Sequence, residues 1–116
     1  MAGLTQATCV PCRGGVPPLD HAGIAALKPQ VADWDVVEVD GVNRLRREFK
    51  FPDFKSAMAF AVAVGELAER EQHHPDLHVA WGKVVVEVWT HKIGGLHEND
   101  FILAAKTDVI HTALGA

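Results

Sequence analysis

The feature that most restricts the fold is a strictly alternating segment, residues 42–51, that directly follows an Asp40-Gly41 pair. Because glycine adopts positive φ angles without strain, an Asp-Gly pair before such a segment favours a tight hairpin turn. Beyond the turn, one face carries Leu45, Arg47, Phe49 and Phe51, and the other carries Arg44, Arg46, Glu48 and Lys50. This alternation predicts two antiparallel strands with one largely buried face. Because Arg47 lies on that face, its centre is not expected to be fully apolar.

A second hairpin and three helices are predicted around this first hairpin. Residues 77–91 alternate on either side of Trp81-Gly82-Lys83, where the second turn is expected. Helices are predicted after the capping residues Asp20 and Asp53, and over residues 97–114. The resulting order is αββαββα, which indicates an α+β fold: a four-stranded antiparallel sheet with helices packed on one face.

The two longer helices each carry an apolar stripe at helical spacing. In the helix after Asp53 the stripe comprises Phe54, Ala57, Met58, Ala61, Gly65 and Ala68, widened by Phe60, Val64 and Leu67. In the last helix it comprises Ile102, Ala105, Val109 and Ala113. Pro75 ends the longer helix, and the residue before a proline avoids helical geometry, so His74 is expected to be extended.

The length of 116 residues fits one domain. Residues 1–18 are rich in Gly, Pro and Thr and are predicted to be a flexible tail, which leaves residues 19–116 as the folded domain. The formal net charge of −4 argues against nucleic acid as a partner. No apolar run approaches the roughly 20 residues that span a membrane, and the first residues do not resemble a secretory signal, so a cytoplasmic protein without membrane contact is expected.

The two cysteines, Cys9 and Cys12, form a single Cys-x-x-Cys pair. A zinc ribbon needs a second pair of ligands, and a thioredoxin-like site places its pair at the start of a helix, which the following Arg-Gly-Gly-Val-Pro-Pro stretch does not favour. The pair is interpreted as two reduced thiols in the tail. A metal site completed by histidine or by a second chain is the alternative.

The stretch EQHHPDLHVAW, residues 71–81, carries the clearest indication of a functional site. His73 and His74 lie at the end of a helix, and neither a helix nor a strand gains packing from such a pair. In a hairpin that turns near residue 82, the end of the second strand lies opposite the start of the first, so His91 is expected to approach the pair. Asp100 follows shortly afterwards and is expected to close the site.

Three interpretations of this cluster compete. In the first, structural interpretation, each histidine is hydrogen-bonded within the fold or exposed to solvent and has no functional role. Neutral imidazole also binds zinc, but adjacent His side chains diverge in an extended backbone, and Pro75 removes the helix on which His74 and His78 would chelate an ion. General acid–base catalysis without a metal is the third interpretation, because imidazole gives and takes protons near neutral pH and no activated nucleophile accompanies the cluster.

The spacing of these residues resembles that of the pterin-4a-carbinolamine dehydratases, also called 4a-hydroxytetrahydrobiopterin dehydratases. The resemblance lies in Glu69-x-x-x-His73-His74-Pro75 followed by Trp81, His91 and Asp100, and in the flanking stretches F-x-D-F and G-G-L-x-E-N-D. It covers roughly residues 19–113, and the αββαββα order is also the fold of that family. His97 departs from the pattern, because Ser or Thr is common there as a helix cap.

The resemblance implies a hydro-lyase that removes water from a pterin-4a-carbinolamine to give a quinonoid dihydropterin, in the recycling of tetrahydrobiopterin. His73, His74 and His91 would be the active-site histidines, with His73 and His91 transferring protons and His74 binding the pterin and assisting. The pterin is the substrate, and the resemblance implies neither a cofactor nor a metal ion.

Four further residues are expected to bind substrate or to orient the histidines. Asp100 would orient a histidine or simply favour the N-terminus of the last helix. Glu69 would brace His73 from one helical turn away or be an exposed helix charge. Trp81 would contact substrate or pack within its hairpin, and Thr90 would hydrogen-bond a ring in the site.

The resemblance also implies self-association as a homodimer or homotetramer, and an aromatic amino acid hydroxylase as a partner in the same pathway. A small antiparallel sheet has edges that need covering, which independently favours a homo-oligomer. Some members of this fold act as protein partners, including a dimerisation cofactor of a transcription factor and assembly factors for a carbon-fixing enzyme. A non-catalytic binding role of this kind is the alternative function.

Overall fold

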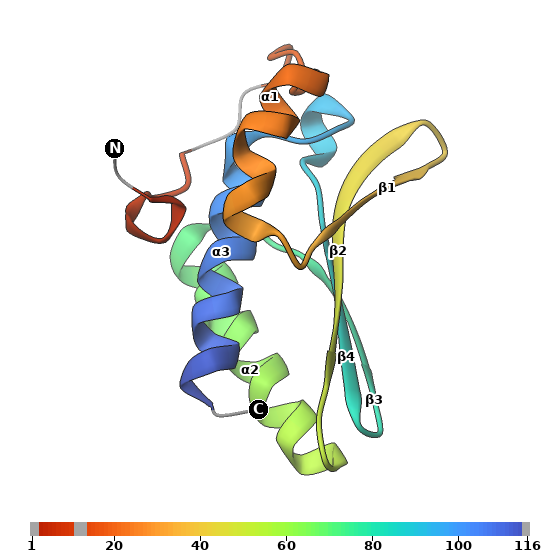
Figure 1. Cartoon of the computed structure of the whole chain (residues 1–116), viewed down its shortest axis with the longest axis vertical. Helices are drawn as coiled ribbons and strands as arrows, with labels where there is room; N and C mark the ends of the chain where they lie inside the picture. Colours follow the sequence, from red (N-terminus) through yellow and green to blue (C-terminus); the bar gives the residue numbers. More distant parts are fainter. Residues whose placement is uncertain (1–2, 11–13, 115–116) are drawn as a thin grey trace.

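The computed structural model describes residues 3–10 and 14–114. Within these residues, four strands form one antiparallel sheet in the order β1-β2-β4-β3: β1 (Asp35–Val39), β2 (Val42–Lys50), β3 (Asp76–Ala80) and β4 (Lys83–Val88). The α-helices of the same part of the chain are α1 (His21–Leu27), α2 (Phe54–Glu71) and α3 (Glu98–Ala113), and they lie on one side of the sheet (Figure 1). The predicted α+β fold and its αββαββα order are confirmed.

Three short 3-10 helices accompany these elements in the described residues: η1 (Leu4–Gln6), η2 (Lys28–Val31) and η3 (His91–Ile93). The second continues α1, and the third follows β4 and carries His91. None of the helices formed by residues 3–10 and 14–114 is long and apolar enough to cross a membrane.

Both predicted hairpins form, with the turns at the expected residues. Asp40 and Gly41 adopt φ angles of 53° and 79°. Two successive positive φ angles in a two-residue turn match the right-handed twist of the strands on either side. At the second turn, Gly82 adopts a φ of 75°, and its carbonyl accepts a 2.8 Å hydrogen bond from the amide of Phe51. That bond ties the end of β2 to the β3–β4 turn and helps to fix the register of the two central strands.

The helix caps predicted from the sequence are also present. Asp20 accepts a hydrogen bond from the amide of Gly23, and Asp53 accepts one from the amide of Ser56, each at 2.8 Å. Each contact satisfies an amide that the first turn of a helix leaves without an intrahelical partner.

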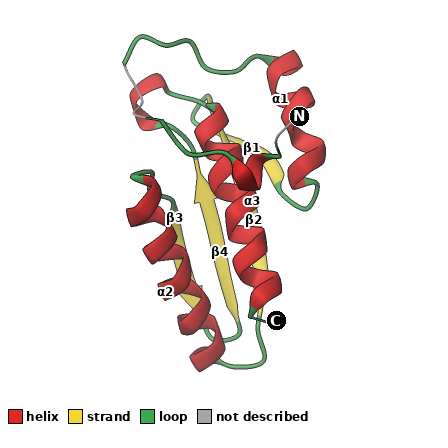
Figure 2. Cartoon of the chain, turned by 90° about the vertical axis from the view of Figure 1, so that its left-hand side faces the viewer, coloured by secondary structure: helices red, strands yellow, loops and turns green. Residues whose placement is uncertain are grey.

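The core lies between the sheet and the two long helices, which run side by side across its inner face (Figure 2). Its largest fully buried side chains are Trp34, Phe49, Phe60, Phe101, Leu45, Leu96 and Leu103. Phe49 and Phe60 contact each other at 4.7 Å between ring centroids, which joins β2 to α2. Truncating a buried aromatic of this kind costs about 3–5 kcal/mol of stability.

Four residues of the predicted stripes do not face this core. Phe54 and Met58 on α2 and Val109 and Ala113 on α3 are exposed. The buried residues of α2 are Ala57, Phe60, Ala61, Val64, Leu67 and Ala68. The apolar surface of α2 is therefore wider than the strip that the sheet and α3 cover, so its outer margin remains in solvent.

Arg47, the polar residue on the buried face of β2, is paired with an acidic residue of α3. Its Nη1 donates to Oδ1 of Asp108 at 2.7 Å, and its guanidinium lies 4.3 Å above the ring of Phe49. The indole of Trp34 donates to the same carboxylate oxygen at 2.8 Å. Burial raises the pKa of Asp108 by more than these two hydrogen bonds lower it. The inner face of the sheet is therefore polar at this point, as the sequence indicated.

The described residues of the predicted tail contact the domain. Leu4 is buried in the core, and its amide donates to Oε1 of Gln30 at 3.0 Å. A contact does not measure mobility, so the flexibility assigned to residues 1–18 stays a prediction.

Candidate active site

A pocket of about 610 Å³ lies where the C-terminal end of α2 meets the end of β4. His73, His74 and His91 line it together, with Pro75, Trp89 and Thr90 among the other wall residues. We call it the His pocket. Its volume lies within the range of small-molecule sites. The structure thus brings together the three histidines that the hairpin geometry was expected to bring together.

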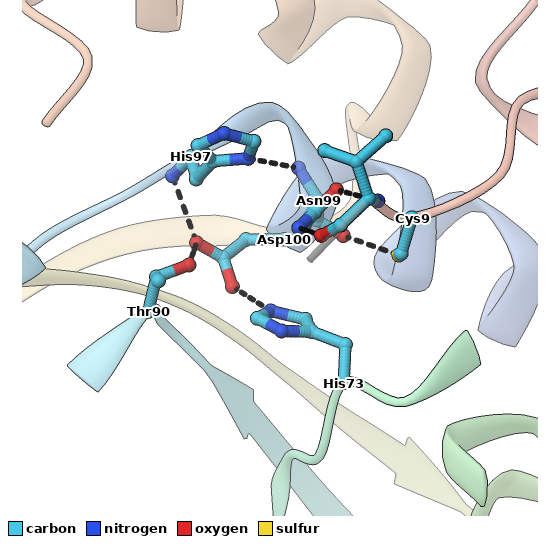
Figure 3. A network of polar contacts seen from close by, with 7 residues as sticks. Cys9, His73, Thr90, His97, Asn99 and Asp100 are labelled. Carbon is cyan, nitrogen blue, oxygen red and sulfur yellow. Dashed lines mark hydrogen bonds and ion pairs between the residues drawn. The ribbon is translucent and has the colours of Figure 1, made fainter. Parts of the chain in front are cut away.

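His73 forms a short hydrogen bond with Asp100 at the inner end of the pocket. Its Nε2 lies 2.6 Å from Oδ1 of Asp100 (Figure 3). The Asp100 side chain is 0% exposed, and that of His73 is 12% exposed. The imidazole is therefore held by a carboxylate from which water is excluded, and the orientation of its ring is fixed.

Asp100 is itself held by two further donors. Its Oδ2 accepts hydrogen bonds from the Thr90 hydroxyl and from the amide of His97, both at 2.9 Å. Nδ1 of His97 in turn accepts a 3.0 Å hydrogen bond from the amide of Asn99. His97 and Asp100 therefore form a reciprocal cap at the start of α3. Both expected placements of Asp100 hold: its carboxylate contacts His73 and also caps the helix.

These contacts assign roles to the two ring nitrogens of His73. Because Oδ2 of Asp100 already accepts two donors, Oδ1 is the acceptor for Nε2–H of His73. Nδ1 makes no hydrogen bond with any other described residue, so it is the nitrogen that can exchange a proton with a bound molecule.

A left-handed residue at the end of α2 directly precedes the two adjacent histidines. Gln72 adopts φ 54° and ψ 38°, and the amide of His73 donates to the carbonyl of Ala68 at 3.2 Å. The chain thereby reverses out of the helix, and His73 points inward to Asp100. Nε2 of His74 instead contacts Oε2 of Glu69 at the surface. The expectation that Glu69 braces His73 is therefore wrong. Glu69 is an exposed charge on the helix, as the alternative held, and it contacts the neighbouring histidine.

His91 is placed by an aromatic stack. Its ring lies against the indole of Trp89, with centroids 4.3 Å apart and an interplanar angle of 34°. The guanidinium of Arg44 lies 3.8 Å from the centroid of the same indole. The backbone also fixes the loop, because Thr90 and Gly95 bridge across it and Gly94 adopts a positive φ of 65°. Cation–π and stacking contacts of this kind favour one ring orientation.

Two of the expected auxiliary residues differ from what the sequence suggested, Trp81 in its position and Thr90 in its partner. Trp81 occupies the β3–β4 turn, is 73% exposed and is not among the residues that line the His pocket. Within one chain it therefore neither contacts a molecule in the pocket nor packs in its hairpin. Thr90 lines the pocket, but its hydroxyl donates to Asp100, so its direct partner is a carboxylate rather than a ring.

Within residues 3–10 and 14–114, no three side chains of His, Cys, Asp and Glu are grouped so that they could hold a metal ion. The absence of a metal from the reaction stays a prediction.

Cys9 is half-buried, and burial, followed by the nearby Glu71 carboxylate, raises the pKa of its thiol to about 12. It is therefore a protonated thiol at neutral pH. Cys12 lies outside the described residues.

The residues of the pocket wall that sequence reasoning missed include Trp89 and Val10. Trp89 had a usable signal, because it lies two residues before His91 in an alternating strand and thus on the same face. Val10 had none, since the segment around it has neither helical nor strand periodicity.

The pocket combines an imidazole oriented by a buried carboxylate with a second imidazole fixed by stacking. Two such groups can protonate a leaving group and remove a proton from one bound molecule, which is general acid–base catalysis. The described wall residues include no serine or cysteine, and their one lysine, Lys92, is exposed to solvent.

Comparisons with known proteins find a matching family and similar sequences. The model of the family described as pterin 4 alpha carbinolamine dehydratase matches residues 17–110. The chain is 51% identical over 113 residues to a protein of Gloeobacter violaceus named "Putative pterin-4-alpha-carbinolamine dehydratase 1", covering 97% of each chain. It is 53% identical over 108 residues to a relative of the same description from Chlorobium limicola, covering 93% of this chain and 96% of the relative.

Two solved structures are also similar. A transcriptional coactivator/pterin dehydratase from Brucella melitensis superposes with a TM-score of 0.72 at 31% identity, covering 80% of this chain and 97% of the other. A pterin dehydratase-like protein described as a RuBisCO assembly factor in the alpha-carboxysome gives a TM-score of 0.58 at 20% identity, covering 67% of this chain and 88% of the other. The second likeness shows the shared fold alone.

Proposed function

Because the chain belongs to the pterin 4 alpha carbinolamine dehydratase family, we propose that it removes water from a 4a-hydroxytetrahydropterin. The product is a quinonoid dihydropterin. The observation that carries the proposal is the His pocket, in which the buried Asp100 carboxylate orients His73 within reach of the same cavity as His91.

The reaction requires two proton transfers and no change of oxidation state. The bond between C4a and the hydroxyl oxygen breaks, and the hydroxyl leaves as water after taking one proton from an acid. The proton on N5 passes to a base, and its electron pair forms the double bond between N5 and C4a. We propose His73 and His91 as the pair that transfers these protons, with His74 binding the pterin and assisting.

The surroundings of each histidine support this division. His73 has one ring nitrogen engaged with Asp100, which leaves Nδ1 for proton exchange. His91 is more exposed and is held by Trp89, so it can face a flat substrate from another wall. His74 has an exposed side chain paired with Glu69, which suits a binding role at the pocket mouth. The proposed reaction uses no metal ion or cofactor, since imidazoles alone can supply both proton transfers.

The test is hydroxylase-coupled turnover of the 4a-hydroxypterin, followed by ultraviolet absorbance. Wild type, His73→Ala, His91→Ala and a chelator-treated sample are compared, with His78→Ala as the control because His78 is exposed on β3 outside the His pocket. Wild type and the control are expected to accelerate dehydration, with or without chelator, and both pocket variants are expected to lose most of that acceleration. Wild-type turnover no faster than buffer would refute the proposed function.

We also propose that the protein is a cytoplasmic homodimer or homotetramer that acts after an aromatic amino acid hydroxylase in tetrahydrobiopterin recycling. The exposed apolar residues Phe54, Met58 and Val62 support self-association, because they recur every four residues along one side of α2. The edge strands β1 and β3 support it too, since each has one side without a strand partner in the described sheet. Sedimentation of the full chain would give the oligomer order.

A protein-binding role is the alternative function. The observation that favours it is the 31% identity to a protein whose description combines a transcriptional coactivator with a pterin dehydratase. The turnover assay separates the two functions, because a purely binding protein would not need His73 and His91 and would not accelerate dehydration.

A further inference from the structure

The N-terminal arm, residues 3–10, lies outside the residues that the family model matches, yet it packs against the domain. Its 3-10 helix η1 contacts α3, and Leu4 is part of the hydrophobic core. From there the arm runs along the ends of α2 and α3 that carry the His pocket. The arm therefore reaches the pocket as a packed segment.

Asn99 joins the arm to the start of α3 through two hydrogen bonds. Oδ1 of Asn99 accepts from the amide of Val10 at 3.0 Å, and Nδ2 of Asn99 donates to the carbonyl of Val10 at 2.7 Å. The Asn99 side chain is buried, so the loss of these bonds would leave its amide group without partners. Two opposed bonds to one residue fix both the position and the direction of the arm backbone.

Glu71 joins the arm to the end of α2. Its Oε1 accepts a 2.9 Å hydrogen bond from the amide of Cys9, and its Oε2 pairs with the ammonium of Lys106 at 2.7 Å. Burial alone would raise the pKa of Glu71, but the Cys9 amide and the Lys106 ammonium outweigh it and lower that pKa. The carboxylate is thus charged at neutral pH and accepts the hydrogen bond from the Cys9 amide of the arm as a charged group.

The two anchors are close in the sequence to the hydrogen-bonded pair of His73 and Asp100. Glu71 precedes His73 by two residues. Asn99 immediately precedes Asp100, and the two lie together at the start of α3 (Figure 3). The arm therefore spans the same two helix ends that the His73–Asp100 contact joins, and it does so at the mouth of the pocket. Val10 is one of the residues that line this pocket, and it is 57% exposed.

We propose that the N-terminal arm is part of the active site, where the Val10 side chain forms an apolar wall that contacts the bound pterin ring. Asn99 and Glu71 are positioning residues for this wall. The inference rests on the proposed dehydratase function. A pterin has polar edges but flat, weakly polar faces, so a wall without hydrogen-bonding groups suits a face. Valine is suited to such a wall, because its branched side chain has few rotamers and keeps its shape when a ligand binds.

The experiment compares Val10→Asp with Val16→Asp in the full chain. Val16 is also an exposed valine near the N-terminus, but it is not a residue of the His pocket. Val10→Asp is expected to raise the KM for the 4a-hydroxypterin about tenfold, because it replaces an apolar contact by a solvated charge, and to change kcat by less than about twofold. Val16→Asp is expected to match wild type.

A second variant tests the anchor by a readout other than turnover. In a Cys12→Ser background, Asn99→Ala is expected to speed alkylation of the Cys9 thiol about tenfold, since release of the arm exposes the thiol and removes the burial that keeps it protonated. The same variant is expected to raise KM as Val10→Asp does.

The possible outcomes separate this inference from the proposed function. If wild type turns over substrate but Val10→Asp keeps the KM of Val16→Asp, the arm is not a substrate wall and the dehydratase function stands. If Asn99→Ala exposes Cys9 without changing KM, the wall is refuted again. If wild type has no dehydratase activity, the proposed function falls and this inference falls with it.

Discussion

Two histidines that are neighbours in the sequence each pair with a carboxylate, but the two pairs lie in very different surroundings. In the inner pair, the side chains of His73 and Asp100 are 12% and 0% exposed. In the outer pair, those of His74 and Glu69 are 57% and 74% exposed. The two pairs consist of the same chemical groups in close contact, so burial and supporting hydrogen bonds are what distinguish them.

The comparison shows how surroundings decide what an imidazole–carboxylate pair can do. An exposed pair is screened by water and stabilises a protein by about 0–1 kcal/mol. A hydrogen bond to a charged group away from water contributes roughly 1.5–3 kcal/mol. Asp100 also receives hydrogen bonds from Thr90 and His97, whereas the Glu69 carboxylate has no second described partner. The inner pair can hold a ring in one orientation, and the outer pair can exchange partners with solvent or substrate.

The largest expected difference is between the histidines themselves. His73→Ala is expected to lower kcat by about 10²–10⁴-fold, the usual contribution of a proton-transferring group. His74→Ala is expected to raise KM more than it lowers kcat, because its proposed role is binding. Steady-state kinetics of the two variants would measure both parameters. Equal losses of kcat would contradict the division of roles between the two pairs.

The carboxylates are expected to differ in the same direction. Asp100→Asn is expected to lower kcat about 100-fold, because an amide in place of the acceptor no longer fixes the His73 tautomer. It also disturbs three hydrogen bonds at a buried position and should cost about 1–3 kcal/mol of stability.

Glu69→Gln, the matched change in the exposed pair, is expected to alter kcat less than about twofold. Thermal unfolding of both variants would separate a folding defect from a catalytic one. A large effect of Glu69→Gln on kcat would show that burial is not what distinguishes the pairs.

A smaller effect is expected from the support of the inner carboxylate. Thr90→Val keeps the shape of the side chain and removes the hydroxyl that donates to Asp100, so kcat is expected to fall about three- to tenfold, with a loss of roughly 1 kcal/mol of stability. Thr90→Ser restores a hydroxyl and is expected to recover most of the rate. Unchanged kinetics in Thr90→Val would mean that Asp100 needs no support from the Thr90 hydroxyl.

A histidine away from the pocket extends the comparison to a partly buried imidazole that is not hydrogen-bonded to a described carboxylate. His111 packs among Phe49, Phe51 and Phe60. Burial, followed by the charge of Arg47, lowers the pKa of His111 below its ordinary value of 6.5. The unfolded chain therefore binds a proton more readily than the folded chain, and stability falls as the pH drops below about 6.5.

Denaturant unfolding between pH 7 and pH 5 would measure this effect. His111→Leu is expected to lose a stability slope of at most about 1.4 kcal/mol per pH unit, the limit for one proton. An unchanged slope in the variant would show that other groups cause the acid sensitivity.

Much of the fold followed from local signals in the sequence. The Asp40-Gly41 turn and the caps at Asp20 and Asp53 are determined by the residues at those positions, and the alternation of β2 is determined by which of its side chains are buried. The meeting of His91 with the His pair followed from the geometry of a hairpin. These features depend on neighbouring residues, so the sequence pattern contains them.

The pairing of each histidine with its carboxylate did not follow in the same way. It depends on the left-handed conformation of Gln72, which glycine or asparagine would have signalled and glutamine does not. The position of the arm depends on the contact of Val10 with Asn99, a pairing that no periodicity marks. Features that arise from contacts between distant segments were the ones that the sequence did not reveal.

The contact between Val10 and Asn99 joins residues 89 positions apart, whereas His73 and Asp100 are 27 positions apart. Since the ribosome makes a chain from its N-terminus, the arm is synthesised long before the helix to which it binds. Contacts between distant residues also form late, because closing a long loop costs entropy before the contact stabilises it. The two hairpins can therefore fold before the pocket exists. A chain released before α3 would contain the sheet and all three pocket histidines, but neither Asp100 nor Asn99, which holds the end of the arm beside them.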